Sequence, residues 1–178
     1  MLAYLFVVFA VVVRLVLPGF VPWLNFTPVG AALLFFGAHQ ARKHMWIPVA
    51  LLAGSDLVLN LFVYHYPVRA EVYVSWAWYA AIVLLGSLLR DNASTVRVLG
   101  ASLATAGSFF VISNFTAWLV MDGLYARSIQ GLMTCYVAAI PFFRNELVSD
   151  VLFSLLFFSV PALLVAMKRQ PAKVRMRA

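Results

Sequence analysis

The feature that most constrains this chain is a series of six apolar stretches, each bounded by charged residues, Pro or Gly. A helix needs about 20 consecutive apolar residues to cross a bilayer, so such stretches predict membrane-spanning helices. Hydrophobic residues make up 65% of the chain, charged residues only 11%, and the mean hydropathy is +0.96, which is far from the composition of soluble domains. We therefore expect an all-α, polytopic membrane protein with six helices, at Leu2–Leu17, Pro28–His39, Met45–Val63, Val72–Leu89, Val98–Met121 and Leu147–Ala166.

The length of 178 residues leaves no room for a separate soluble domain, so we expect one transmembrane domain over 1–178, with a short basic tail at about 167–178. The first two stretches are shorter than a full span unless part of the Pro18–Thr27 connection is helical or lies at membrane depth. The run from Leu2 to Val13 has no basic region before it and no small-residue cleavage site, so we expect a retained first helix and not a signal peptide.

The distribution of Lys and Arg predicts the orientation in the membrane. On a six-helix path, nine of these residues fall on one side and three on the other, which places both termini in the cytoplasm under the positive-inside rule. The nine are Arg42, Lys43, Arg90, Arg97, Lys168, Arg169, Lys173, Arg175 and Arg177, and the three are Arg69, Arg127 and Arg144. The same imbalance accounts for most of the net charge of +7, so we expect a solvated, lipid-facing tail and no nucleic-acid partner.

Several kinds of chemistry lack their usual residues. Cys135 is the single cysteine, and His39, His44 and His65 have no metal-ligand spacing, so neither a metal site nor a cofactor is expected. No Gly-rich phosphate loop, Ser-His pair or HExxH motif occurs in the sequence. We therefore expect that the chain is not an enzyme.

The polar residues inside the apolar stretches share one depth. Asp56 and Asn114 each lie seven residues from the outer end of their stretch, about 10 Å below the outer boundary, and Arg14 and Asp150 lie about one turn below it. The i,i+4 pairs Asp56–Asn60, Asn114–Trp118 and Glu146–Asp150 each give a helix one polar stripe. Because a charged group in hydrocarbon costs roughly 2.5–3.5 kcal/mol, these stripes should face an outward-opening pocket or a closed internal network. Asp56 could equally form a structural pair with Arg14.

Two segments between the helices have alternative interpretations. In the turn Asn25-Phe26-Thr27-Pro28, Asn25 or Thr27 would cap the second helix, and the same turn could form one wall of a pocket. Residues 122–145 are too polar for another span but carry an apolar stripe, which predicts an amphipathic helix at the outer surface, either a lid or a connector. The candidate substrate-binding residues are Asn25, Phe26, Thr27, Asp56, Asn60, Asn114, Trp118, Tyr136 and Asp150.

Four motifs in order, "LNFTPVGAALLFFGA", "GSDLVLN", "SNFTAWL" and "TCYVAAIPFFRN", make the chain similar to a family of small bacterial membrane proteins described as transport proteins. That family in turn resembles the substrate-binding S components of energy-coupling-factor vitamin transporters. The resemblance implies uptake of a vitamin or related micronutrient across the bacterial cytoplasmic membrane, with Pro18–Thr27 as part of a cap over the pocket.

The resemblance also bears on partners. S components dock an energising module through small residues spaced by four on the first helix, whereas here that helix has Ala3 and Ala10 and no such pair. This departure is compatible with a solitary protein, with another partner or with self-association. The alternatives to transport are an intramembrane enzyme that uses Asp56 and Asp150 as an acid–base pair, and a structural subunit of a membrane complex.

Overall fold

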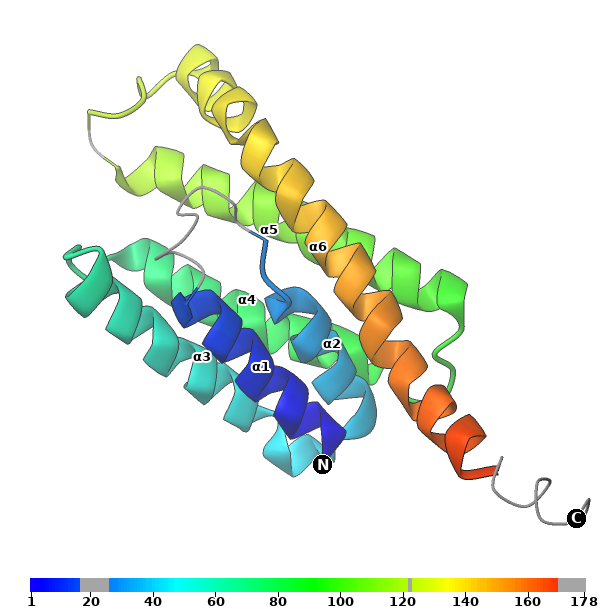
Figure 1. Ribbon diagram of the computed structural model, residues 1–178. Coiled ribbons are helices and arrows are strands. Elements are labelled where there is room, and N and C mark those ends of the chain that lie inside the picture. The colour runs from blue at the N-terminus through cyan, green and yellow to red at the C-terminus, as the bar shows by residue number, and fades with distance from the viewer. Residues whose placement is uncertain (17–25, 122, 170–178) are drawn as a thin grey trace, which may run out of the picture.

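The chain folds into a bundle of α-helices. The computed structural model describes residues 1–16, 26–121 and 123–169 (Figure 1). Within these ranges there is no strand, and the six helices are α1 (Leu2–Val16), α2 (Val29–His39), α3 (Trp46–Val58), α4 (Ala70–Ser87), α5 (Thr95–Val120) and α6 (Ile129–Arg169). A 3-10 turn at Arg42–His44 precedes α3, and a π-helical segment at Leu59–Val63 extends it. The predicted all-α class and the count of six helices are thus confirmed for the described residues.

The helices have the length and surface of a membrane-embedded protein. Four helical stretches are long and apolar enough to cross a bilayer, whereas α1 and α2 are shorter apolar helices. Large apolar side chains are exposed on the outer face of α1, for example Leu5, Val8 and Val12, each about half exposed. Exposed apolar surface of this extent indicates contact with lipid or with another protein.

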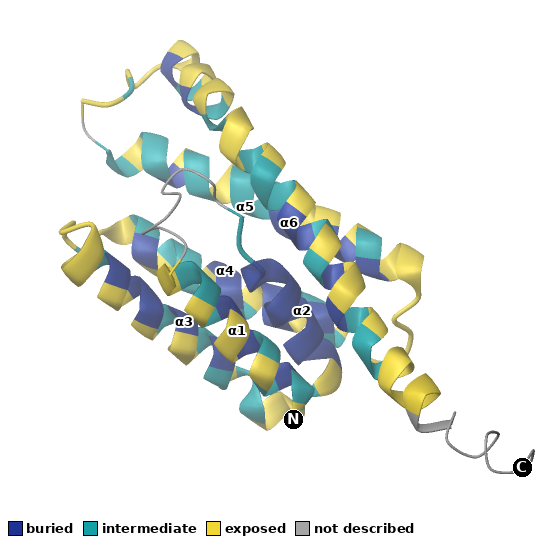
Figure 2. Cartoon of the chain, in the orientation of Figure 1, coloured by how far each residue is buried: buried dark blue, intermediate teal, exposed yellow. Residues whose placement is uncertain are grey.

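The short helix α2 lies at the centre of the bundle. It packs against α1, α4, α5 and α6, and every residue from Val29 to Ala38 is buried, as Figure 2 shows by its almost continuous dark blue. A helix that is apolar all round is stable only when it is enclosed on all sides. Its 11 residues rise about 16 Å, roughly half the hydrocarbon thickness, so neighbouring helices extend beyond its ends.

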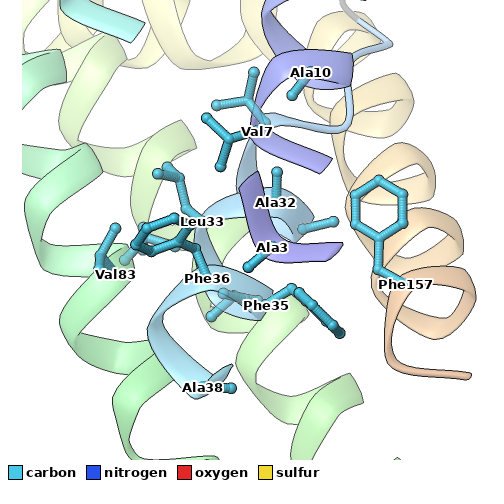
Figure 3. Close-up of a cluster of buried hydrophobic side chains, with 14 of the residues drawn as sticks. Ala3, Val7, Ala10, Ala32, Leu33, Phe35, Phe36, Ala38, Val83 and Phe157 are labelled. Carbon is cyan, nitrogen blue, oxygen red and sulfur yellow. The ribbon is translucent and has the colours of Figure 1, made fainter. Parts of the chain in front are cut away.

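Aromatic side chains fill the space between α2 and the helices on one side of it. The rings of Phe6 and Phe157 stack with their centroids 4.0 Å apart, and Phe35 meets Phe6 and Phe158 edge to face. Figure 3 shows Phe35 and Phe157 in this cluster beside the small residues Ala3 and Ala32. Alanines on α1 and α2 therefore allow close packing, and rings from α6 close the core.

The contact between α2 and α4 depends on glycine. A Cβ atom added at Gly86 would lie 2.9 Å from the Cα atom of Leu34, and one added at Gly37 would overlap the backbone carbonyl oxygen of Val83. Real Cβ atoms essentially never approach backbone atoms below 3.0 Å. The two helix backbones can cross this closely because small residues stand at the crossing.

The structure corrects the prediction of a separate amphipathic helix before the last span. Residues 129–169 form the single 41-residue helix α6, which contains Pro141 and Pro161. The polar segment continues the helix because it packs on α5: the hydroxyl of Tyr136 donates to the carbonyl oxygen of Val111 (2.8 Å) and the rings of Phe110 and Phe143 lie 4.5 Å apart. Neighbouring helices allow proline inside a membrane helix because they help to satisfy the freed backbone groups.

Candidate functional site

A cavity of about 310 Å³ lies where α1 and α3 end and α2 and α4 begin. All six helices, or the residues next to them, contribute to its wall. Among the described residues the lining comprises Arg14, Thr27, Val29, Gly30, Asp56, Leu59, Asn60, Tyr64, Glu71, Val72, Ser75, Trp78, Tyr79, Phe109, Glu146 and Asp150. Its volume is at the lower end of the range of small-molecule sites.

One side of the cavity is a closed polar network around Asp56. The guanidinium of Arg14 forms an ion pair with the Asp56 carboxylate and donates from Nη1 to the Tyr79 hydroxyl (2.6 Å). The indole Nε1–H of Trp76 donates to Asp56 Oδ2 (2.9 Å), so both carboxylate oxygens have partners. The pair between Arg14 and Asp56 that the sequence suggested is therefore present, and the charge of Asp56 is offset by a neighbouring cation.

The end of α3 carries an irregular backbone next to this network. The helix widens into π-helical geometry at Leu59–Val63, and the Asn60 side chain donates to the carbonyl oxygen of Asp56 (2.9 Å). Shortly afterwards His65 has a left-handed backbone with φ of 54°, which is uncommon for a residue other than glycine. Single-turn π segments are frequent at functional sites, and here Leu59 and Asn60 both line the cavity.

Another part of the cavity wall is formed by Asp150 of α6, whose carboxylate meets the start of α2. Its carboxylate accepts a hydrogen bond from the backbone N–H of Ala31, and a Cβ at Gly30 would lie 2.6 Å from Oδ2. The neighbouring Ser149 donates to the carbonyl oxygen of Thr27 (2.7 Å). Helix α6 therefore supplies the anion that the free N–H groups of a helix N-terminus favour.

The predicted cap of α2 is consequently replaced. Pro28 occupies the N-cap position and makes no side-chain cap hydrogen bond. The Asp150 carboxylate takes that role from another helix, a contact that local sequence spacing does not reveal. Asn25 lies outside the described residues.

Two of the acidic side chains have a buried oxygen atom without a hydrogen-bond partner. Among the described residues, these are Asp150 Oδ2 and Glu71 Oε2, both buried. The Asp150 side chain is 2% exposed and lines the cavity. Buried polar atoms nearly always have partners, so each of these two atoms needs an explanation.

The candidate residues from the sequence divide into two groups. Thr27, Asp56, Asn60 and Asp150 line the cavity together. Phe26 does not; its ring packs on Phe153 with centroids 5.7 Å apart.

The other three candidates do not line the cavity: Asn114 and Trp118 lie beyond it toward the end of α5, and Tyr136 lies near the start of α6. All three side chains donate to backbone carbonyl oxygens. Asn114 donates to Phe110 (2.8 Å), Trp118 to Ala126 (2.9 Å) and Tyr136 to Val111. Their predicted depths were counted in residues from the outer end of each helix, which is valid only if all the helices end at the same height in the membrane. On α5 it is Phe109 that reaches the cavity, and Asn114 lies about 7 Å beyond it.

Sequence reasoning missed several lining residues. Glu71 lies in the first turn of α4, which begins at Ala70, but the predicted span started at Val72 and left this carboxylate in the loop. The aromatic residues Trp78, Tyr79 and Phe109 were not distinguishable from ordinary membrane-facing rings. Glu146 was on the polar stripe of Asp150, and its i,i+4 spacing was the signal that could have identified it.

A family model described as a family of unknown function, DUF6580, matches residues 1–173. No curated protein and no solved structure matches the chain.

Proposed function

We propose that this chain, which belongs to the DUF6580 family of unknown function, is a multi-pass protein of the bacterial cytoplasmic membrane that binds a small organic nutrient for uptake. The observation that carries the proposal is the cavity of about 310 Å³, whose wall takes polar side chains from separate helices. A concave site in which a few polar groups converge among apolar and aromatic side chains is the usual form of a small-molecule site.

The orientation proposed from the positive charges gives the cavity its direction. With both termini in the cytoplasm, α1 runs outward, so Arg14 near its end is on the outer side. The cavity would then receive its ligand from outside, as in S components of vitamin transporters. A cap formed by Pro18–Thr27 remains a prediction, since residues 17–25 lie outside the described part of the chain.

The surface of α1 favours a solitary protein over one that docks the usual energising module. Ala3 and Ala10 are 1% and 0% exposed and pack in the core, so they offer no docking surface. The outward face of α1 carries larger residues such as Leu5 and Phe9. We propose that any energising partner is contacted elsewhere.

Cavity filling tests the proposal. Ser75 lines the cavity, and its hydroxyl is already bonded to the Glu71 carbonyl of its own helix, so Ser75→Trp fills space without removing a bond between helices. The matched control is Ser159→Trp, at an exposed position of α6 that does not line the cavity.

Native mass spectrometry of protein purified in mild detergent is the measurement. We expect wild type and Ser159→Trp to retain a small molecule, or to gain thermal stability from a small-molecule extract of growth medium, and Ser75→Trp to do neither. The proposal would be overturned if wild-type protein retained no small molecule and gained no thermal stability from the extract, which is the behaviour expected of Ser75→Trp.

A further inference from the structure

The acidic residues of this chain are concentrated in one place. The chain has six Asp and Glu residues, and four of them line the cavity: Asp56, Glu71, Glu146 and Asp150. Among the described lining residues Arg14 is the only basic one, although the chain has 13 Lys and Arg in total. The cavity is therefore acidic in a protein that is strongly basic overall.

The single arginine does not balance these charges. Arg14 is bound to Asp56 and Tyr79, which leaves Glu71, Glu146 and Asp150 without an ion-pair partner among the described residues. Glu146 and Asp150 lie one turn apart on α6, a spacing at which like charges destabilise a helix. A carboxylate taken out of water is stable only when a cation, hydrogen bonds or a proton compensates for its charge.

The two buried carboxylate oxygen atoms without partners mark the positions where such a cation would bind. Asp150 Oδ2 is buried, belongs to a side chain that is 2% exposed, and lies in the cavity wall. Glu71 Oε2 is the second such atom, on α4. Asp56, by contrast, has a partner for each oxygen.

The geometry favours an organic cation over a metal ion. Among the described residues, no three His, Cys, Asp or Glu side chains come close enough together to hold a metal ion. The wall also includes the rings of Tyr64, Trp78 and Phe109. The Nε1–H of Trp78 is already bonded to Ser108 (3.0 Å), so its ring contributes aromatic surface and no free donor. Aromatic rings attract ammonium groups.

We infer that the cavity binds a small organic cation, a protonated amine or a quaternary ammonium compound, whose charged group lies among Glu71, Glu146 and Asp150 while Arg14 remains paired with Asp56. This inference rests on the proposed function and specifies its ligand. It differs from a general vitamin pocket because it excludes neutral and anionic nutrients.

The test identifies the charge of what the protein binds. Protein from detergent-solubilised membranes is examined by native mass spectrometry, and its melting temperature is measured with matched probes: choline against 3,3-dimethylbutan-1-ol, and phenethylamine against 2-phenylethanol and 3-phenylpropionate. We expect the retained compound, and any probe that stabilises the protein, to carry a positive charge.

Neutral, near-isosteric variants locate the site. Glu71→Gln should weaken binding of the retained compound or the stabilising cationic probe by at least about tenfold, since it removes a negative charge that attracts the cation, and close charge pairs contribute at least that much. Asp91→Asn, at an exposed position between α4 and α5, is the matched control and should leave binding unchanged. Asp150→Asn is a second variant; if its loss of the Asp150 carboxylate charge at the start of α2 impairs folding, Glu71→Gln and Glu146→Gln still test the site.

The outcomes separate the two proposals. A retained compound or stabilising probe that is neutral or anionic, or a cation whose affinity is the same in Glu71→Gln and Glu146→Gln, would overturn the inference and leave the proposed function standing. If wild-type protein bound no compound, which is the behaviour expected of Ser75→Trp, both the inference and the proposed function would be overturned.

Discussion

Replacing Gly86 with Ala should separate the two helices at the centre of the bundle. The added Cβ atom would lie 2.9 Å from both the Cα and the carbonyl carbon of Leu34, whereas ordinary contact begins at 3.4 Å. These are backbone atoms that cannot rotate away, so α2 and α4 must move apart by at least about 0.5 Å. A gap of that size removes roughly a quarter of the van der Waals attraction along the contact, and overpacking of this kind costs about 1–3 kcal/mol.

Thermal unfolding in one detergent measures the effect. At roughly 2–4 °C per kcal/mol, the Gly86→Ala protein should melt several degrees below wild type. The control is Gly54→Ala on α3, where an added Cβ meets nothing within 4 Å, so the better helix propensity of Ala should leave stability equal or higher by up to about 1 kcal/mol. Equal melting temperatures for the two variants would refute the reasoning that close backbone approach fixes this crossing.

Three further predictions follow from single contacts. Arg14→Met should destabilise the protein by about 3–5 kcal/mol because it leaves the charge of Asp56 without its cation. Combining Arg14→Met with Asp56→Asn should recover part of that loss in the same melting assay. If the losses of stability of the two single variants simply added up in the double variant, this reasoning would be contradicted. Asn114→Ala should leave ligand retention in native mass spectrometry unchanged, because its amide bonds within its own helix; loss of the ligand would return Asn114 to the site. Ser149→Ala should cost about 1–3 kcal/mol in unfolding free energy, since it leaves the Thr27 carbonyl without its donor, and a neutral result would contradict the bond.

Most of the helices could be predicted because hydrocarbon imposes a simple rule on the sequence. A span must be continuous and apolar, so the predicted Pro28–His39 and the observed Val29–His39 differ by one residue. The full length of α6 could not be predicted in the same way. Its first part is polar and contains Pro141, and only the contacts of Tyr136 and Phe143 with α5 explain why the helix continues.

Residues of the candidate site could be predicted where a charged group stands in an apolar stretch. They could not be predicted where the answer depends on how far along the bundle each helix begins and ends. Asp56 and Asp150 stand in apolar stretches, and because a charged side chain is costly in hydrocarbon, the sequence alone predicts that both face the bundle interior. The sequence does not show whether the ends of different helices lie at the same height, so counting residues from each end put Asn114 at the depth of Asp56. Glu71 was missed for a related reason: α4 begins at Ala70, two residues before the predicted start, and this boundary error placed a lining carboxylate in the loop.

The contrast between the two sides of the cavity separates a binding site from a structural network. A polar layer that only held helices together would pair each of its charges, as Arg14, Trp76 and Tyr79 do for Asp56. Insertion of each further carboxylate costs roughly 2.5–3.5 kcal/mol, yet Asp150 and Glu71 keep oxygen atoms without partners in the same cavity. The backbone N–H of Ala31 offsets part of this cost at Asp150, and a positively charged ligand would offset more of it at both carboxylates.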